Sequence, residues 1–247
     1  MAIFFFFRIL LGTLFTLAAV VFFFWAFFLP YAWRVRFIKP IGMLWAKIMT
    51  YQILGLKVHK DLKDFDLSKR VGYISVSNHL SFLDIPVLSS SLHKMFLMKR
   101  SLLWTPFGWG AYLCGALSLT RNNAREQIHA IYSVVKISKT VEAMHLFPEG
   151  TRSKDGKLGP FKRGSLHKIY QEKLPVLALA LWGTNLALPK NSLNFNPKVP
   201  IFLKVDSWVR PEDFSQFSDF QQAVTQAVQR ALTACQIDFD HHFASKN

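Results

Sequence analysis

The sequence is poor in cysteine and in acidic residues, and each shortage excludes a class of protein. Only Cys114 and Cys235 occur in 247 residues, far apart and without metal-type spacing, so neither a disulfide framework nor a thiolate zinc site is expected. This cysteine usage fits a reducing compartment. Asp and Glu number 15 against 30 Lys and Arg, which gives a formal net charge of +15. A lasting partner should therefore be anionic: nucleic acid, phospholipid head groups or phosphorylated metabolites.

The sequence also lacks the polar bias of a disordered chain. Hydrophobic residues make up 51% of it, and Phe alone occurs 24 times, so we expect a packed core. No internal repeat or low-complexity linker interrupts the chain. Its length suits one domain with an appendage.

Charge is missing altogether from residues 9–29, a run of 21 positions. At ~1.5 Å per residue, a helix of this length covers a hydrocarbon core of about 30 Å. A cleaved secretory signal would have a shorter apolar region followed by small residues, and no such site follows here. Trp33, Arg34 and Arg36 come next, and this mixture of aromatic and basic residues favours the cytoplasmic interface. The pattern predicts a membrane anchor with the rest of the chain on the cytoplasmic side.

A second apolar stretch, residues 41–58, is interrupted by two lysines and a glutamine. This indicates an interfacial or packing helix rather than a second membrane span. Two alternatives stay open, namely a helical hairpin buried in the protein and a two-helix motif embedded in one leaflet. We assign residues 1–60 to an N-terminal membrane-anchoring helical segment and residues 61–247 to an α/β domain.

From residue 71 onward, short β-rich runs alternate with helical patterns. The alternation predicts a single α/β domain with a central mixed or largely parallel sheet flanked by helices. The predicted strands are residues 71–77, 95–98, 116–120, 143–147, 175–182 and 201–205. The asparagine pair at 122–123 is expected to cap one helix, and apolar residues recurring every four positions from Phe220 to Leu232 predict another. We expect the polar tail, residues 238–247, to fray.

Candidate chemistry begins with His79 and Asp84, which follow the first of these strands. Side chains five residues apart on a straight helix point about 140° away from each other, so the pair cannot share a helical face. The spacing makes sense if His79 lies on the strand-to-helix connection and Asp84 in the first helical turn, where its carboxylate can orient the imidazole. Ser81 and Asp84 also resemble a capping box, in which Asp84 would satisfy only backbone amides. No Gly-x-Ser-x-Gly elbow is present, so a covalent acyl-enzyme is not indicated.

A second candidate site is formed by Glu149, Gly150, Thr151 and Arg152, again at the end of an apolar run. Glycine permits close approach of the backbone, threonine offers a hydroxyl, and arginine supplies a forked donor that matches phosphate or carboxylate. An anion cradle is one interpretation. A simple loop with a solvated arginine is the other.

Lys99 and Arg121 follow two further predicted strands. If the sheet is parallel, both cations lie with the first two candidate sites at the carboxyl edge of the strands, where open α/β sheets bind ligands. Each cation could instead be a solvated surface charge.

Taken in order, these residues resemble the glycerolipid acyltransferase family typified by 1-acyl-glycerol-3-phosphate acyltransferase. The similar blocks are His79 with Asp84, Lys99 through Arg121, residues 147–152 and residues 174–176. The likeness covers roughly residues 70–182. The fourth block departs from the family at Ala178, where a second proline is common, and this leaves the acyl-chain preference open.

The resemblance implies transfer of a fatty acyl group to the sn-2 hydroxyl of 1-acyl-glycerol-3-phosphate, giving phosphatidic acid. The donor would be acyl-CoA or acyl carrier protein as a cosubstrate, and no metal or organic cofactor is expected. His79, oriented by Asp84, would be the general base, while Arg121, residues 149–152 and Lys99 would position the phosphate. The length and hydrophobic leader resemble short bacterial members, which implies a bacterial inner membrane with the catalytic domain on its cytoplasmic face.

Two alternatives to this reaction remain. An enzyme of the same kind could act on another lysolipid, such as a lysophospholipid or a lyso-aminolipid, or on glycerol 3-phosphate. A non-catalytic, membrane-anchored binding protein is the more distant alternative. Nucleic acid is not expected as a partner, because basic and aromatic residues do not interleave in the way that base-stacking surfaces require.

Overall fold

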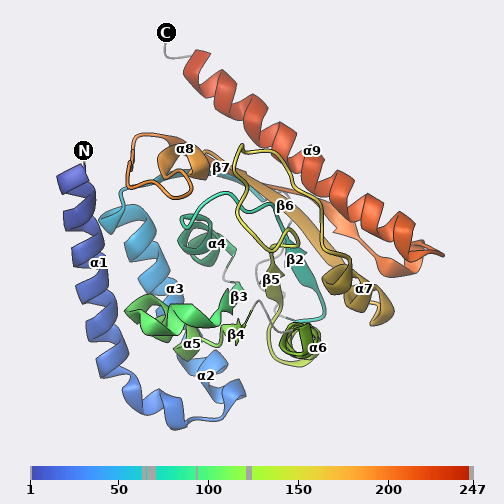
Figure 1. Cartoon of the computed structure of the whole chain (residues 1–247), viewed down its shortest axis with the longest axis horizontal. Coiled ribbons are helices and arrows are strands. Elements are labelled where there is room, and N and C mark those ends of the chain that lie inside the picture. The colour runs from blue at the N-terminus through green and yellow to red at the C-terminus, as the bar shows by residue number, and fades with distance from the viewer. Residues whose placement is uncertain (1, 63–64, 66–70, 93, 121–123, 245–247) are drawn as a thin grey trace.

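A computed structural model describes residues 2–62, 65, 71–92, 94–120 and 124–244 (Figure 1). Its helices are α1 (Ala2–Phe22), α2 (Tyr31–Phe37), α3 (Lys39–Lys47), α4 (Asp84–Leu92), α5 (Pro106–Leu113), α6 (Ala124–Thr140), α7 (Arg163–Gln171), α8 (Thr184–Ala187) and α9 (Phe217–Ala244). Its strands are β1 (Lys57–Asp61), β2 (Ile74–Val76), β3 (Met95–Lys99), β4 (Leu117–Leu119), β5 (Met144–Leu146), β6 (Val176–Trp182) and β7 (Pro200–Val209). Short 3-10 helices span Phe24–Phe28, Arg100–Trp104 and Pro211–Asp213, and a π-helix spans Ile48–Ile53.

Within the described residues, the strands form one sheet in the order β1-β7-β6-β2-β5-β3-β4. Neighbours from β6 to β4 are parallel, whereas β7 is antiparallel to β6 and parallel to β1. The central strands β2 and β5 are buried at every residue, as expected for parallel strands covered on both faces. The predicted α/β fold with a largely parallel, mixed sheet is confirmed. The connections that leave β2, β3 and β5 consequently meet at one edge of the sheet.

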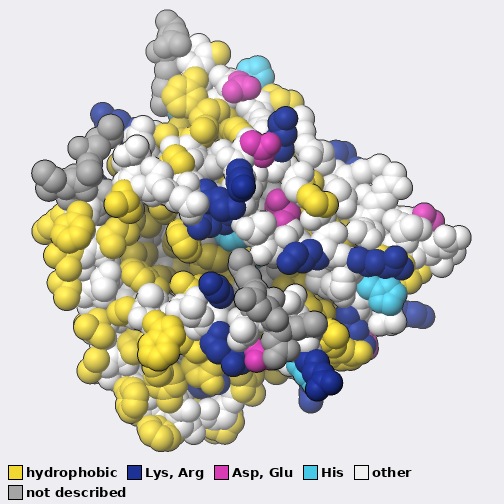
Figure 2. Space-filling view, viewed as in Figure 1, with side chains coloured by type: hydrophobic (Ala, Val, Ile, Leu, Met, Phe, Trp, Pro, Cys, Tyr) yellow, Lys and Arg dark blue, Asp and Glu magenta, His cyan; other side chains and the backbone are white. Residues whose placement is uncertain are grey.

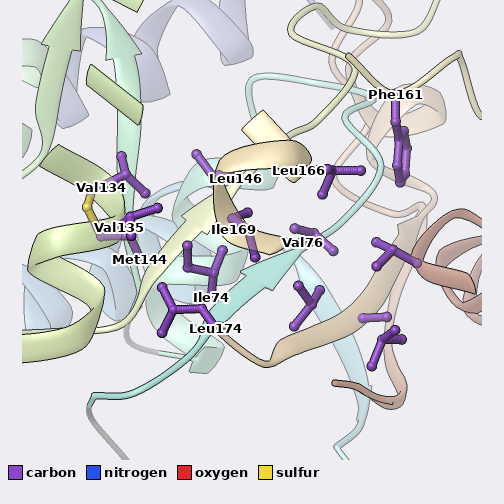
Figure 3. Packing of buried hydrophobic residues seen from close by; sticks show 14 of the residues in the cluster. Ile74, Val76, Val134, Val135, Met144, Leu146, Phe161, Leu166, Ile169 and Leu174 are labelled. Atoms are coloured by element: carbon purple, nitrogen blue, oxygen red, sulfur yellow. The ribbon is translucent and has the colours of Figure 1, made fainter. Parts of the chain in front are cut away.

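Side-chain alternation along β6 shows how the two faces of the sheet are covered. Leu177, Leu179 and Leu181 pack on one face with α4, while Val176 and Ala178 pack on the other face with α6, α7 and α9. Figure 3 shows part of this second cluster, in which Ile74 and Val76 of β2 lie beneath residues of α6 and α7. Ala178 therefore packs beneath α9, where its small side chain allows the helix to lie close to the strand.

The N-terminal helices pack beside the sheet and are tied to it by polar contacts. Lys39, at the start of α3, forms a buried ion pair of 2.7 Å with Glu142, which precedes β5. The Tyr31 hydroxyl donates a 2.8 Å hydrogen bond to the carbonyl of Gly115, which precedes β4. Because the ion pair is desolvated on both sides, removal of either partner would leave an uncompensated charge in the interior.

Several details differ from the sequence-based expectations. The uncharged run at 9–29 does not form one helix, because α1 ends at Phe22 and the chain continues as a 3-10 helix to Phe28. In the part of the chain that the structure describes, no helix has both the length and the apolar character needed to cross a bilayer. The stretch 41–58 is not helical throughout, since it passes through the π-helix into β1, an edge strand that was not predicted. The tail is also more ordered than expected, as α9 continues to Ala244.

Candidate functional site

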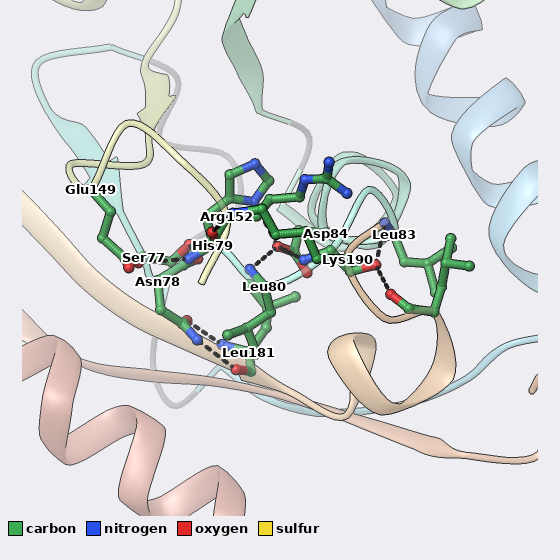
Figure 4. Close-up of polar contacts among 12 residues, drawn as sticks. Ser77, Asn78, His79, Leu80, Leu83, Asp84, Glu149, Arg152, Leu181 and Lys190 are labelled. Atoms are coloured by element: carbon green, nitrogen blue, oxygen red, sulfur yellow. Dashed lines mark hydrogen bonds and ion pairs between the residues drawn. The ribbon is translucent and has the colours of Figure 1, made fainter. Parts of the chain in front are cut away.

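His79 and Asp84 meet at the connection between β2 and α4. Asp84 is the first residue of α4 and is fully buried. One of its oxygens, Oδ2, lies 2.8 Å from Nδ1 of His79 and accepts hydrogen bonds from the backbone N–H groups of Leu80 (2.7 Å) and Ser81 (2.9 Å). The contacts are drawn in Figure 4. Asp84 therefore orients the imidazole and also holds the chain that enters α4, so the two interpretations of the motif are compatible.

The contact with Asp84 determines which nitrogen of His79 carries the proton. A carboxylate accepts only, so Nδ1 is assigned as the N–H donor and Nε2 keeps a lone pair. The ring stacks on Phe147 with centroids 4.0 Å apart and planes 17° apart, and it lines a cavity. Only 14% of the side chain is exposed. A histidine paired with a buried carboxylate in this way can act as a general base.

The loop that follows β5 holds the backbone of His79 from both sides. Glu149 Oε1 accepts from the His79 N–H at 3.0 Å, and the Ser153 N–H donates to the His79 carbonyl at 2.7 Å. The second oxygen of Glu149 accepts from the Gly159 N–H at 3.0 Å. Burial raises the pKa of the Glu149 carboxyl, against the lowering effect of these hydrogen bonds. Both oxygens of Glu149 are therefore engaged with backbone N–H groups, one of His79 and one within the loop that follows β5.

Asn78 forms a further connection, which no local sequence pattern indicates. Its side-chain amide donates to the Leu181 carbonyl and accepts from the Leu181 N–H, both at 2.9 Å. Asn78 thereby pairs with the end of β6 as a strand backbone would, although the two residues are 103 positions apart. The result is that His79 lies between two fixed points, β6 on one side and the loop after β5 on the other.

Gly150 and Arg152 line the same cavity. Gly150 has a φ of +69°, a backbone conformation that other residues rarely adopt, so the position favours glycine. The Arg152 guanidinium lies over the Phe82 ring at 3.9 Å from its centroid. The ammonium group of Lys190 donates to the Arg152 carbonyl at 2.5 Å. Thr151 and Arg152 both line the cavity.

Of the two other predicted cations, Lys99 and Arg121, the structure describes only Lys99. Lys99 is the last residue of β3, is exposed, and lines the cavity. Arg121, like Asn122 and Asn123, lies outside the described residues. Lys162, which belongs to the basic stretch after the second candidate site, also lines the cavity. Nothing in the sequence singled out Lys168 or Lys190, which line it as well.

The cavity has a volume of about 1130 Å³ and is lined by both cationic and apolar side chains. Its cationic part includes Lys99, Arg152, Lys162, Lys168 and Lys190. Its apolar part, supplied largely by α1, α3, α5 and neighbouring residues, includes Val20, Phe23, Ile41, Phe107 and Leu113. Figure 2 shows basic side chains around the middle of this face and hydrophobic surface over the N-terminal helices. Such a wall fits a molecule that has both an anionic group and a hydrocarbon chain.

The chain is similar in sequence to proteins of a known family. The profile of the family described as Acyltransferase matches residues 60–182. The 1-acyl-sn-glycerol-3-phosphate acyltransferase of Salmonella typhimurium is 30% identical over 184 residues, which cover 73% of this chain and 72% of that protein. A chloroplastic 1-acyl-sn-glycerol-3-phosphate acyltransferase of Brassica napus is 34% identical over 162 residues, covering 65% of this chain. The chain spans about half the length of that plant relative, 46%.

A solved structure supports the fold. The crystal structure of the 1-acyl-sn-glycerophosphate (LPA) acyltransferase PlsC from Thermotoga maritima superposes with a TM-score of 0.72 at 24% sequence identity. The match covers 92% of this chain and 95% of that one.

Proposed function

The chain belongs to the 1-acyl-sn-glycerol-3-phosphate acyltransferase family, and on this premise we propose that it transfers a fatty acyl group to the sn-2 hydroxyl of 1-acyl-glycerol-3-phosphate, forming phosphatidic acid. The resemblance expected from the sequence is confirmed by these relatives. The observation that carries the proposal is the His79–Asp84 pair, 2.8 Å apart, on the wall of a cavity that is both cationic and apolar.

The proposed reaction needs one base and no covalent acyl-enzyme intermediate. Nε2 of His79 takes the proton of the sn-2 hydroxyl as that oxygen attacks the thioester carbonyl of the donor. The resulting tetrahedral oxyanion collapses and expels the donor sulfur, which receives the proton from the imidazolium. Asp84 stabilises the imidazolium between the two steps. A general base in such a position contributes about 10² to 10⁴ in rate.

The acceptor phosphate is assigned to the cationic part of the cavity. Arg152 offers a forked donor suited to phosphate, and its guanidinium is held by stacking on the exposed Phe82 ring. Lys99 and Lys190 line the same cavity and add charge. Arg121, which the resemblance also implies, remains a proposal. Fixing the phosphate would orient the sn-2 hydroxyl toward His79.

We further assign the apolar part of the cavity to the acyl chains and the N-terminal helices to contact with lipid. Large apolar side chains are more than 40% exposed along α1, among them Phe6, Phe7, Leu10, Leu14 and Phe22. Exposed apolar surface of this extent marks an interaction site, and the net charge of +15 favours an anionic leaflet. In this proposal residues 1–60 form the membrane-anchoring segment, and the site works on the cytoplasmic face.

The donor is proposed to be acyl-CoA or acyl carrier protein, both of which are acidic and present a thioester. Either one acts as a cosubstrate, and the proposed chemistry uses no metal or organic cofactor. Among the described residues, no cluster of three or more His, Cys, Asp or Glu side chains is placed to hold a metal ion.

A panel of acceptors and donors tests the proposed function. Purified protein in detergent would be assayed with lysophosphatidate, lysophosphatidylcholine, monoacylglycerol and glycerol 3-phosphate, each with acyl-CoA and with acyl carrier protein. Lysophosphatidate should give the highest kcat/KM, and His79→Ala should remove turnover with every acceptor. Equal or better turnover of monoacylglycerol would overturn the phosphate assignment of Arg152.

A further inference from the structure

A second histidine, His145, lies buried behind the proposed catalytic residue. It is the middle residue of β5, has no exposed surface, and pairs in register with Ser75 of β2. Its Nδ1 lies 2.9 Å from the Ser75 hydroxyl, and its Nε2 lies 3.0 Å from the Ser77 hydroxyl. Both nitrogens of a fully buried imidazole are thus bound by two serines of the neighbouring chain segment.

The hydrogen bonds around His145 run in one direction. Ser77 donates its hydroxyl proton to the Asn78 carbonyl at 2.8 Å, so it can only accept from His145, and this places the ring proton on Nε2. Nδ1 then accepts from the Ser75 hydroxyl. Burial lowers the pKa of His145 to about 3, which agrees with a neutral ring that carries a single proton. The chain therefore leads from Ser75 through His145 and Ser77 to the Asn78 carbonyl.

The end of this chain is the peptide bond that begins His79. The carbonyl of that peptide accepts from Ser77, and its N–H belongs to His79 and donates to Glu149. The peptide plane is consequently held at both polar atoms. Rotation of this plane would move the Cα of His79 and its ring.

A second path connects the two histidines through an aromatic ring. His145 contacts Phe147 edge to face, with centroids 4.8 Å apart and planes 72° apart. Phe147 in turn stacks on the His79 ring at 4.0 Å. Loss or displacement of the His145 ring would therefore affect the position of the His79 ring both through the Asn78–His79 peptide and through the stacked Phe147 ring.

We propose that His145 is a positioning residue, whose hydrogen-bond chain to the Asn78 carbonyl and contact with Phe147 fix the His79 imidazole for proton transfer. The inference rests on the proposed function, because it gives His79 the role of general base. It assigns His145 no contact with substrate. In the sequence, His145 lies in an otherwise apolar strand and shows no sign of this role.

Substitutions that preserve the hydrogen bond of one His145 nitrogen but not of the other test the proposal. The side-chain nitrogen of His145→Gln can replace the Nε2–H that donates to Ser77, whereas the shorter His145→Asn can replace only the Nδ1 acceptor for Ser75. His145→Leu replaces neither. Met144→Leu is the matched control, since Met144 is equally buried on the same strand but faces the opposite side of the sheet.

The expected result is a split between kcat and KM. Displacement of a catalytic group by about 1 Å can cost about 10² in rate, so His145→Leu and His145→Asn should lower kcat about 10- to 10²-fold with both KM values changed less than about twofold. His145→Gln should recover at least threefold over His145→Leu. Met144→Leu should keep kcat within about twofold. Equal kcat for the Gln and Asn variants, or a loss of kcat that follows the loss of Tm across all four proteins, would overturn the proposal.

Nitrogen NMR of histidine-labelled protein decides the inference independently of activity. The wild-type spectrum should show His145 as the Nε2–H tautomer and His79 as the Nδ1–H tautomer, with the signals assigned from His145→Leu and His79→Ala. In His145→Leu, the His79 nitrogen signals should shift, whereas in Met144→Leu they should not. Unchanged His79 signals in His145→Leu would refute the positioning role even if the protein is active. If no acceptor is turned over by the wild type, the proposed function fails, and the same spectra still report whether His145 controls the His79 ring.

Discussion

Asp84 is expected to serve two purposes that substitution can separate. Its Oδ2 accepts from His79 and from the backbone N–H groups of Leu80 and Ser81. Asp84→Asn keeps an oxygen that can accept from the two backbone groups, and asparagine is a good residue at a helix start. It removes the negative charge beside the imidazole. Asp84→Ala removes both the charge and the backbone acceptor.

The loss of rate in Asp84→Asn can be estimated from the distance. At 2.8 Å and an effective dielectric constant of about 20, a carboxylate attracts an imidazolium by about 6 kcal/mol. The partial exposure of His79 and the dipole of the new amide reduce the difference between the two proteins to about half of this, roughly 3 kcal/mol. Each 1.36 kcal/mol changes the rate about tenfold, so kcat should fall by about 10².

The two variants should also differ in stability, with Asp84→Asn close to the wild type and Asp84→Ala destabilised. Asp84→Asn should melt within about 2 °C of the wild type, since about 1 kcal/mol changes the Tm of a domain of this size by about 2–4 °C. Asp84→Ala should be destabilised by a further 1–3 kcal/mol or so, because two buried N–H groups lose their acceptor. Release of the donor thiol, followed continuously at saturating acceptor, gives kcat, and calorimetry gives Tm. A fully active Asp84→Asn together with an unstable Asp84→Ala would show that Asp84 only caps α4.

Three further predictions concern stability and acceptor binding. Glu142→Gln should destabilise the protein by about 3–5 kcal/mol in urea unfolding, because it leaves the buried Lys39 charge unpaired. The double variant Lys39→Met/Glu142→Leu should cost less, since neither charge remains. A double variant less stable than Glu142→Gln would contradict this. Burial lowers the pKa of His145 to about 3, so below about pH 6.5 the unfolded chain takes up a proton at this residue and the folded protein does not. The free energy of unfolding should therefore fall as the pH drops, by up to about 1.4 kcal/mol per pH unit. His145→Leu should lack this part of the slope in urea titrations between pH 7 and 5, and an unchanged slope would refute the neutral buried ring. Lys190→Met should raise the KM for lysophosphatidate about fivefold or more with little change in kcat. The control Lys198→Met, at an exposed position, should change neither value. A KM of Lys190→Met equal to that of the wild type would remove Lys190 from the phosphate site.

The features that could be predicted from the sequence are those that depend on neighbouring residues. The spacing of His79 and Asp84 was sufficient to place them on a strand-to-helix connection, because the contact closes within five residues. The strands predicted from residue 71 onward are present because continuous apolar runs identify buried strands. Arg152 could be expected near His79 once β2 and β5 were taken as parallel, since parallel strands end at one edge.

The features that could not be predicted depend on contacts between distant residues. Asn78 pairs with Leu181, and Lys190 reaches the Arg152 carbonyl from a segment that belongs to none of the family's motifs. The edge strand β1 is largely exposed and polar, so it lacks the apolar run by which the other strands were found. Glu149 was expected to contact substrate, and only the structure shows that both of its oxygens bind backbone N–H groups.

The most direct test of the account is the turnover of lysophosphatidate by wild-type protein and by His79→Ala, measured side by side at saturating donor and acceptor. The two proteins should have the same circular dichroism spectrum, because alanine keeps the backbone N–H and C=O of His79, to which Glu149 and Ser153 bind. We predict phosphatidate formation by the wild type and a decrease of at least about 10² in His79→Ala. A folded His79→Ala protein that forms phosphatidate at a rate within a few-fold of the wild type would contradict the assignment of His79 as the base.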